Sequence, residues 1–275
     1  MATNKYICKV CGYTHEGDTP PATCPVCKVP ASDFDLVSQK KAGMFSDKNS
    51  NAYIITYSTV MVVVVAFFLA FTAMSLKSRQ AENILNEKKN AILVSLNESE
   101  KSYDEFISAF AIDATGNKVA GVEGEAVLDM LADLKSTLQG DVLPVFQSTD
   151  GRVVVPIFGS GLWGDIWGYV ALESDMNTIS GVVLDHAGET PGLGAEIATV
   201  KHQAQYKGKS IFEGDDFVSI TLVKGGATDA NISHEVDGIS GGTKTADGVT
   251  AMFSSSLAKY VKYFKSQMGV NNVNQ

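Results

Sequence analysis

The sequence predicts a multi-domain protein that consists of a small metal-binding knot, one transmembrane helix and an α+β domain. All four cysteines lie within the first 27 residues of the 275-residue chain. Residues 49–76 contain no charged side chain, and the hydrophobic period changes from helical to strand-like near residue 141. We therefore divide the chain into a knot at 1–37, a linker at 38–51, a membrane helix at 52–76 and an α+β domain at 77–275.

The cysteines form two C-x-x-C pairs that are separated by twelve residues: Cys8, Cys11, Cys24 and Cys27. In an oxidising compartment four cysteines could form two disulfides. Two tight turns that each present two thiolates instead favour a tetrahedral metal site with four sulfur ligands. Zinc and iron both accept four thiolate ligands, so the spacing predicts a metal site and leaves the choice between these two metals open.

The residues around the ligands form a recognisable set: Tyr6, Cys11-Gly12-Tyr13, His15-Glu16-Gly17, Cys24-Pro25-x-Cys27 and Phe34. Together they resemble a rubredoxin, and most closely the rubredoxin-like domain of rubrerythrins, over about residues 4–37. This resemblance implies one iron bound by the four cysteines for one-electron transfer, with a zinc ribbon as the alternative. Lys28 departs from the family pattern, because glycine is usual there and tolerates a left-handed turn.

Residues 52–74, AYIITYSTVMVVVVAFFLAFTAM, form a continuous apolar stretch. At about 1.5 Å per residue, a helix of this length crosses a hydrocarbon core of about 30 Å. The apolar residues cover all faces of the helix, and Tyr53 and Tyr57 stand where an aromatic belt would lie, which argues against a buried core helix. The position is also wrong for a cleaved signal peptide. We expect a single-pass protein of the inner (cytoplasmic) membrane, in contact with lipid.

The basic residues on the two sides of this stretch are balanced, so the positive-inside rule does not decide the orientation. A reduced thiolate metal site is kept most easily in the cytosol, and the sequence after the stretch has no cysteine. We therefore place the cysteine knot in the cytoplasm and the larger domain in the periplasm or otherwise outside the cytoplasm. Residues 77–275 carry 16 basic and 26 acidic side chains, which argues against a nucleic-acid partner.

Helical periodicity predicts helices in SRQAENILNEKKNAILVSL (78–96), SYDEFISAF (102–110) and EGEAVLDMLADLKSTL (123–138). Short β-branched runs bounded by turn residues predict strands from DVLPVFQ (141–147) onward, in GRVVVPIFG, WGYVALE, TISGVVLDHA and FVSITLVKGG. A last amphipathic helix is predicted from Asp247 to Lys265. Its apolar stripe comprises Val249, Met252, Phe253, Leu257, Tyr260, Val261 and Phe264.

A glycine-rich loop, DGISGGTKTADGV at 237–249, precedes the last helix. Small residues allow backbone N–H groups to approach an anion, and a helix N-terminus adds a favourable dipole. The same residues also suit an ordinary turn in which Thr245 or Asp247 is the helix N-cap. Taken alone, the loop leaves a phosphate site and a structural turn open.

Three longer stretches bear on this loop: GLWGDIWGYVALESDMNTISGVVLDHAGETPGLGAEI (161–197), VKGGA (223–227) and VDGISGGTKT (236–245). They closely resemble the C subunit of the sodium-translocating NADH:quinone oxidoreductase. With the membrane helix and SRQAENILNEKKNAIL, the resemblance covers about residues 50–265. Its most specific motifs are GETPGLG and the flavinylation pattern D-x-x-S-G-A-T, which is matched here by Asp237, Ser240, Gly241 and Thr243. Gly242 stands where alanine is usual.

In that family a flavin transferase joins FMN to the motif threonine through a phosphoester, which implies Thr243 in this chain. The resemblance places the other cofactor contacts in the motif, in the loop after residue 188 and nearby: Asp237, Ser240, Gly241, Gly242, Glu189, Thr190, Gly192, Leu193, Gly194, Trp163 and Lys224. GGAT at 225–228 lacks the aspartate and serine of the motif, so we interpret it as a decoy. We expect no catalytic side chain, and His186, His202 and His234 show no metal-ligand spacing.

These observations predict a membrane-anchored electron-transfer subunit that holds an iron centre on its four cysteines and covalent FMN. By resemblance, its partners are the other membrane subunits of a sodium-translocating NADH:quinone reductase, and a flavin transferase matures it. Direct NADH binding is not expected, because no G-x-G-x-x-G follows a predicted strand. Two alternatives remain: the flavin-bearing subunit of the Rnf ferredoxin:NAD oxidoreductase, and a membrane-anchored zinc-ribbon sensor without enzymatic function.

Overall fold

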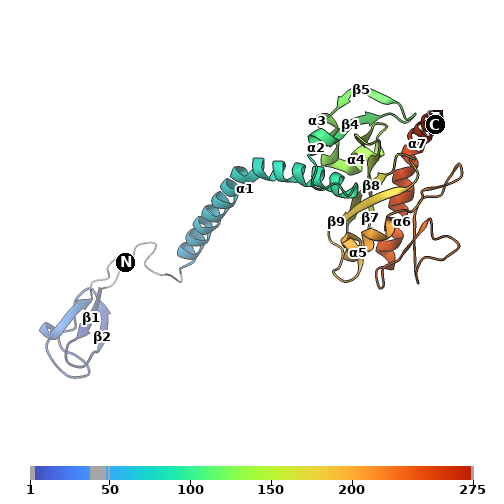
Figure 1. Cartoon of the computed structure of the whole chain (residues 1–275). Helices are drawn as coiled ribbons and strands as arrows, with labels where there is room; N and C mark the ends of the chain where they lie inside the picture. Colours follow the sequence, from blue (N-terminus) through green and yellow to red (C-terminus); the bar gives the residue numbers. More distant parts are fainter. Residues whose placement is uncertain (1–3, 38–47, 49, 274–275) are drawn as a thin grey trace. The chain divides into compact units, whose positions relative to one another are not determined.

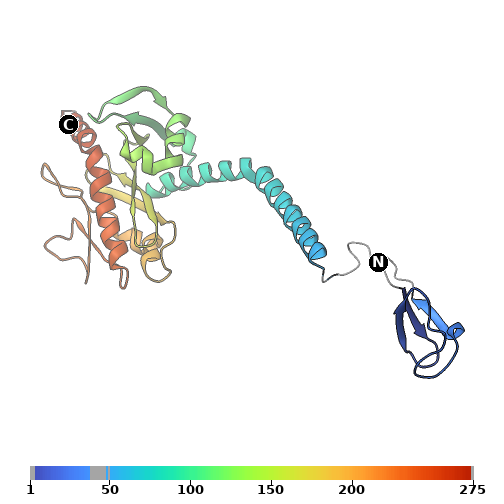
Figure 2. The same cartoon turned by 180° about the vertical axis from the view of Figure 1, so that it is seen from behind.

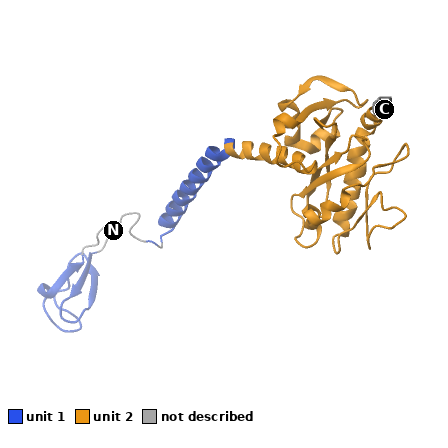
Figure 3. Ribbon diagram, in the orientation of Figure 1, with its two compact units in different colours: residues 1–78 blue, residues 79–275 orange. Residues whose placement is uncertain are grey.

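The computed structural model describes residues 4–37, 48 and 50–273, and the side chains of these residues up to 269. Two compact units divide the chain, residues 1–78 and residues 79–275 (Figure 3). Most of the predicted linker at 38–51 lies outside the described residues.

The N-terminal residues form a three-stranded antiparallel sheet. Strand β1 (Asn4–Cys8) pairs with β2 (Thr14–Gly17) on one edge and with β3 (Phe34–Val37) on the other, and a short 3-10 turn, η1 (Ala31–Asp33), leads into β3. The buried centre consists of Cys8, Cys24 and Phe34. So small an apolar core does not hold a domain together alone, so this unit depends on a cross-link such as a metal ion.

A single helix, α1 (Asn51–Ser95), contains both the apolar stretch and the helix predicted after it (Figure 1). No glycine or proline interrupts these residues, and the segment after Leu76 consists mostly of good helix formers, so the helix continues past the apolar stretch. Its most apolar window has a mean hydropathy of 2.5 and no buried side chain. Among the described residues, α1 is the one helix that is long and apolar enough to cross a membrane.

The larger unit is built on a six-stranded antiparallel sheet with the strand order β5-β4-β6-β7-β8-β9. These strands are β4 (Ile107–Ile112), β5 (Lys118–Glu123), β6 (Leu143–Ser148), β7 (Val153–Ser160), β8 (Asp165–Leu172) and β9 (Ile179–His186). Their β-branched residues suit a pleated surface that is covered on both faces. The predicted α+β domain is confirmed.

One predicted helix, at 102–110, is wrong over most of its length. Helix α2 contains only Tyr103–Phe106, and residues from Ile107 onward form strand β4. The reason is tertiary: β4 pairs with β6 along its whole length, with Ile107 opposite Ser148 and Ile112 opposite Leu143. This ladder outweighs the weak helical period of a nine-residue segment.

Two layers of helices cover the two faces of the sheet (Figures 1 and 2). One face packs against α6 (Thr243–Leu257), η5 (Ala258–Tyr260) and α7 (Val261–Val273), through Val153, Val155 and Ile157 of β7. On the other face, Val154 and its neighbours pack against the end of α1 and against α3 (Glu125–Met130). Adjacent residues of β7 point to opposite faces of the sheet, and both sets are buried, so this strand is covered on both faces.

Shorter elements complete the larger unit. They are η2 (Leu131–Asp133), α4 (Leu134–Gln139), η3 (Gly194–Ala198), α5 (Val200–Gln203), η4 (Ala204–Tyr206), β10 (Phe212–Glu213), β11 (Asp216–Phe217), β12 (Thr221–Val223) and β13 (Glu235–Asp237). Strands β12 and β13 pair in parallel, which brings the start of the glycine-rich loop beside Val223.

The C-terminal helix starts earlier than predicted. Helix α6 begins at Thr243 with Gly242 as its N-cap, so neither Thr245 nor Asp247 caps it, and helical structure continues beyond Lys265 to Val273. Gly241, at φ +74°, makes the sharp turn that allows this early start. Six of the seven residues in the predicted apolar stripe are buried, and Val261 is half-buried.

Arg152 fixes the end of α1 to the sheet. Its guanidinium donates to the carbonyl oxygen of Leu96 (2.7 Å), to Glu98 (2.8 Å) and to Asp150 (2.6 Å). The side chain is only 13% exposed. The hydrogen bond from Arg152 is the main reason why the pKa of Asp150 falls to about 2. A charged donor at the C-terminal end of a helix is also favoured by the helix dipole.

Replacing Arg152 by methionine should lower the free energy of unfolding by about 2 kcal/mol, because it removes the charge-assisted hydrogen bonds of a largely buried guanidinium. Lys101→Met is the matched control. Lys101 also pairs with Glu98 but is 45% exposed, so its loss should cost less than about 1 kcal/mol. Urea unfolding of the full chain in detergent measures both values, and equal losses would contradict the role given to Arg152.

Candidate functional sites

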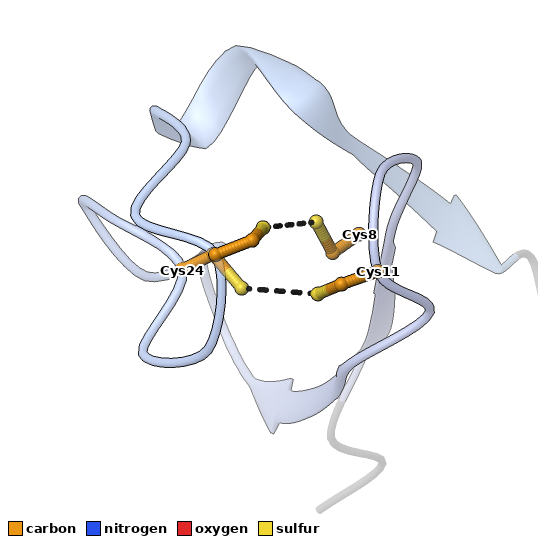
Figure 4. A group of neighbouring side chains, drawn as sticks. Cys8, Cys11 and Cys24 are labelled. Atoms are coloured by element: carbon orange, nitrogen blue, oxygen red, sulfur yellow. Dashed lines mark hydrogen bonds between the residues drawn. The ribbon is translucent and has the colours of Figure 1, made fainter.

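The four cysteine sulfur atoms form one compact cluster in the N-terminal unit (Figure 4). All four lie within 4.8 Å of one another, with Cys8 Sγ 3.6 Å from Cys27 Sγ and Cys11 Sγ 3.5 Å from Cys24 Sγ. A tetrahedral ion with metal–sulfur bonds of about 2.3 Å requires sulfur–sulfur separations of about 3.8 Å. The cluster therefore fits a single four-coordinate ion with little adjustment.

Two similar turns present these ligands. In the first, the backbone N–H of Gly12 donates to the carbonyl of Cys8 (2.9 Å); in the second, that of Lys28 donates to the carbonyl of Cys24 (3.0 Å). The backbone N–H groups of Cys8 and Cys24 each donate to the carbonyl five residues further along the chain. Each C-x-x-C pair thus has the same backbone frame, which holds its two thiols on one side.

Lys28 adopts the left-handed backbone conformation that glycine would adopt more easily. Its φ is +62°, and Gly12, at the equivalent place of the first turn, has φ +74°. For a residue with a Cβ this conformation costs about 1–2 kcal/mol. The four cysteines are therefore brought together in spite of the strained backbone at Lys28.

One edge of the cluster reaches the surface. Cys8 and Cys24 are buried, Cys27 is half-buried and Cys11 is exposed. Val10 and Val26, which occupy the same position in the two turns, are 64% and 65% exposed. The accessible edge of the metal site is thus bordered by apolar side chains.

The second site surrounds Thr243, in a pocket of about 150 Å³ in the larger unit. Three segments line this Thr243 pocket: the turn after β7, the loop after β9 and the start of α6. Their lining residues are Leu162, Trp163, Glu189, Thr190, Leu193, Gly194, Gly241, Gly242, Thr243, Lys244 and Thr245. The structure thus brings together predicted residues that are about 80 positions apart in the sequence.

Thr243 is the first residue of α6, and it is exposed. Gly242 before it is buried, and a Cβ there would lie 2.8 Å from Ile239 Cγ2. The alanine that is usual at this position would require Ile239 to move. Glycine at position 242 therefore fits the local packing of this chain.

Glu189 is a buried carboxylate in the wall of the Thr243 pocket, with 4% exposure. It accepts a hydrogen bond from the Thr245 hydroxyl (2.6 Å) and one from the Trp163 backbone N–H (2.8 Å). Burial raises the pKa of Glu189, but these hydrogen bonds outweigh it and hold the pKa below its ordinary value. The carboxylate is therefore charged at neutral pH.

The predicted motif residues Asp237 and Ser240 lie on an exposed strand end and turn before α6. Asp237 accepts a hydrogen bond from the Ala227 backbone N–H (2.8 Å), so the decoy segment 225–228 lies directly beside the motif. Lys224 is exposed and does not line the Thr243 pocket, although its backbone nitrogen is close to Gly238. Three other predicted contacts, Asp237, Ser240 and Gly192, likewise do not line this pocket. Lys224 lies beside Asp237, because the preceding residue, Val223, pairs with Asp237.

Exposed apolar side chains form the rim of the Thr243 pocket: Leu162 (54%), Trp163 (70%) and Leu193 (41%). The sequence analysis missed Leu162, although it precedes Trp163 in the GLWGD segment. Trp167 and Tyr169 line a different cavity, of about 460 Å³, between α1 and the sheet. The two cavities share no lining residue.

The histidines have structural contacts. His186 Nδ1 accepts from the Glu189 backbone N–H, His202 hydrogen-bonds Tyr206, and His234 contacts the Ser210 carbonyl. Among the described residues, the cysteine cluster is the one group of potential ligands close enough to hold a metal ion.

The residues around Thr243 fit a flavin that is attached through its phosphate. Thr243 is exposed at a helix N-terminus, whose N–H groups and dipole favour an anion. Beside it, the apolar rim offers Trp163 to a planar ring.

Comparison with known proteins agrees with both sites. Residues 161–258 match the FMN-binding domain family, and residues 6–35 match the rubredoxin-like domain of rubrerythrin. The fold and sites thus define an FMN-binding domain protein with an added rubredoxin-like domain.

Relatives make the assignment more specific. The C subunit of the Na(+)-translocating NADH-quinone reductase of Vibrio anguillarum is 34% identical over 215 residues, which cover 70% of this chain and 84% of the relative. The corresponding protein of Pseudomonas aeruginosa is 28% identical and covers 78% of this chain and 94% of the relative. The chain belongs to the family formed by the C subunits of the Na(+)-translocating NADH-quinone reductase.

Solved structures show the same similarity. The crystal structure of the C subunit from Parabacteroides distasonis superimposes with a TM-score of 0.61 at 40% identity, over 69% of this chain and 96% of that chain. For the Shewanella oneidensis NqrC the TM-score is 0.55 at 29% identity, over 69% of this chain and 98% of that chain.

Lys28→Gly should stabilise the metal-loaded N-terminal domain by up to about 1 kcal/mol, because glycine removes the left-handed strain at some cost in chain entropy. The control is Gly12→Ala in the equivalent turn, which should be destabilising. No atom lies within 4 Å of a Cβ at Gly12, so any loss there reflects the backbone alone. Thermal unfolding, monitored by the release of the metal, tests both variants. A Lys28→Gly variant that is less stable than the native chain would contradict the backbone strain inferred at Lys28.

Proposed function

We propose that the chain is the electron-transfer subunit of an ion-translocating NADH:quinone reductase, with FMN joined to Thr243 by a phosphoester. The observation that carries this proposal is the exposed position of Thr243 at the start of α6, within a pocket rimmed by Leu162, Trp163 and Leu193. Membership of the family of C subunits supports the same function.

The attachment is a phosphoryl transfer to Thr243 Oγ1. A flavin dinucleotide supplies the FMN group: the bond from Thr243 Oγ1 to phosphorus forms, the pyrophosphate bond breaks, and a nucleoside monophosphate leaves. The threonine proton passes to a base of the flavin transferase or to water. When bound, FMN supplies redox chemistry that protein side chains lack. The chain's own residues hold the phosphate end at the helix start and leave room for the ring at the rim.

Thr243→Ala should abolish covalent flavin, because it removes the hydroxyl that accepts the phosphoryl group. The matched control is Thr228→Ala, an exposed threonine in the neighbouring GGAT segment. After coexpression with a flavin transferase, a denaturing gel under ultraviolet light should show a dark Thr243→Ala band and a fluorescent control band. Fluorescence that persists in Thr243→Ala and maps to another threonine would refute the attachment of FMN to Thr243.

The N-terminal cluster is proposed to hold one iron that changes between two oxidation states. Four thiolates of rubredoxin type bind either iron or zinc. Cys11 is exposed, and the surface beside it is apolar, which gives a partner protein close access to the metal for electron exchange. A purely structural zinc has no need of such an accessible edge.

The length and composition of α1 and membership of the family support a proposal for location and assembly. We place α1 across the inner membrane, with the rubredoxin-like domain in the cytoplasm and the FMN domain on the opposite side. The partners would be the other membrane subunits of the quinone reductase. The Rnf-type flavin subunit is the second candidate within the same chemistry, but the relatives and solved structures compared above are all of the quinone reductase.

Cys24→Ser should remove the visible absorption of the iron centre and leave covalent flavin unchanged, because the two sites lie in separate compact units. Metal analysis should give one iron per chain in the native protein. One zinc per chain and no visible absorption beyond that of the flavin, in protein from iron-replete cells, would exclude an electron-transfer role for this domain.

A further inference from the structure

Thr243 and Thr245 stand two residues apart in the first turn of α6, yet their environments are opposite. Successive residues of a helix are rotated by about 100°, so these two side chains point to nearly opposite sides. Thr243 is exposed, whereas Thr245 is 1% exposed and its hydroxyl donates to Glu189. The hydrogen bond between Thr245 and Glu189 thus fixes the buried side of the first turn of α6, which faces away from Thr243.

Glu189 connects all three walls of the Thr243 pocket. It belongs to the loop after β9, its Oε2 accepts from Thr245 at the start of α6, and its Oε1 accepts from the Trp163 backbone N–H in the turn after β7. Both carboxylate oxygens are therefore used, and each one fixes a different wall. Trp163 keeps its backbone fixed while its side chain remains 70% exposed at the rim.

Two glycines make room for this carboxylate. A Cβ at Gly161 would lie 2.4 Å from Glu189 Oε1, and a Cβ at Gly194 would lie 2.3 Å from Glu189 Oε2 and 2.5 Å from Thr245 Oγ1. A Cβ at either glycine would therefore force Glu189 or Thr245 to shift. Gly161 and Gly194 therefore provide the space that the Glu189 carboxylate and the Thr245 hydroxyl occupy.

We infer that Glu189 is a positioning residue of the flavin site, which acts through Thr245 to present Thr243 to the flavin transferase and to hold the pocket walls together. The inference rests on the proposed attachment at Thr243 and gives Glu189 a role that differs from direct flavin contact. The hydrogen bond between Glu189 and Thr245 orients the helix turn that bears the acceptor hydroxyl.

The test compares isosteric variants of the purified full chain in detergent. Flavin transferase and a flavin dinucleotide are added, and in-gel fluorescence is followed over time. Thr245→Val keeps the shape of the side chain and removes the hydroxyl, so labelling of Thr243 should slow by about tenfold or more. Thr245→Ser keeps the hydroxyl and should restore the rate to within about twofold of the native chain.

Thr250→Val is the matched control. It makes the same substitution on the same helix and removes one hydrogen bond, which Thr250 accepts from the Leu222 backbone N–H (3.0 Å), away from the pocket. Its labelling rate should equal that of the native chain even if its thermal stability falls.

Equal labelling rates for Thr245→Val and Thr250→Val would overturn the inference while leaving flavin attachment at Thr243 intact. A native chain that takes up no flavin, or takes it up elsewhere, would instead refute the proposed function. If Thr245→Val does not fold, Glu189→Gln replaces it. Glutamine offers one acceptor oxygen to two donors and should also slow labelling, and a native rate for that variant would equally overturn the inference.

Discussion

The close packing of α6 against the end of β7 is the constraint on which the larger unit and its site depend. A Cβ at Gly248 would lie 2.4 Å from the Ser160 carbonyl oxygen, and a Cβ at Gly159 would lie 2.7 Å from Met252. Ser256 further along α6 exchanges hydrogen bonds with the backbone of Phe158. Since α6 cannot move away from β7 without losing this packing, the position of Thr243 relative to the sheet is set by the core.

The two sites obtain their geometry in different ways. Each pair of cysteines is presented by one short turn, and the same hydrogen bonds recur in both turns. The Thr243 pocket, in contrast, combines three segments that meet only after the sheet and α6 have packed. The cysteine cluster is therefore formed by local chain geometry, whereas the Thr243 pocket is a product of the tertiary fold.

This difference explains what the sequence could predict. The cysteine cluster and the apolar stretch followed from spacing and composition, because both are local properties. The strain expected at Lys28 was also local and is present. Strand β4 was mistaken for helix, because only pairing with β6 decides the conformation of Ile107–Ile112. The contact between Glu189 and Thr245 spans 56 residues, and no local pattern reports it. Resemblance predicted most of the residues that line the Thr243 pocket, but not Leu162, Lys244 or Thr245.

The separate origins of the two sites also bear on how a rubredoxin-like domain can be joined to a protein of this family. The rubredoxin-like domain takes its order from four ligands and a few backbone hydrogen bonds, and residues 1–78 form their own compact unit. Its addition therefore requires no change in the core that places Thr243. In turn, α1 is fixed to the larger unit by Arg152, whose partners Leu96, Glu98 and Asp150 all lie beyond the apolar stretch. The cysteine cluster and the Thr243 pocket thus lie in different compact units, and each is built without residues from the other unit.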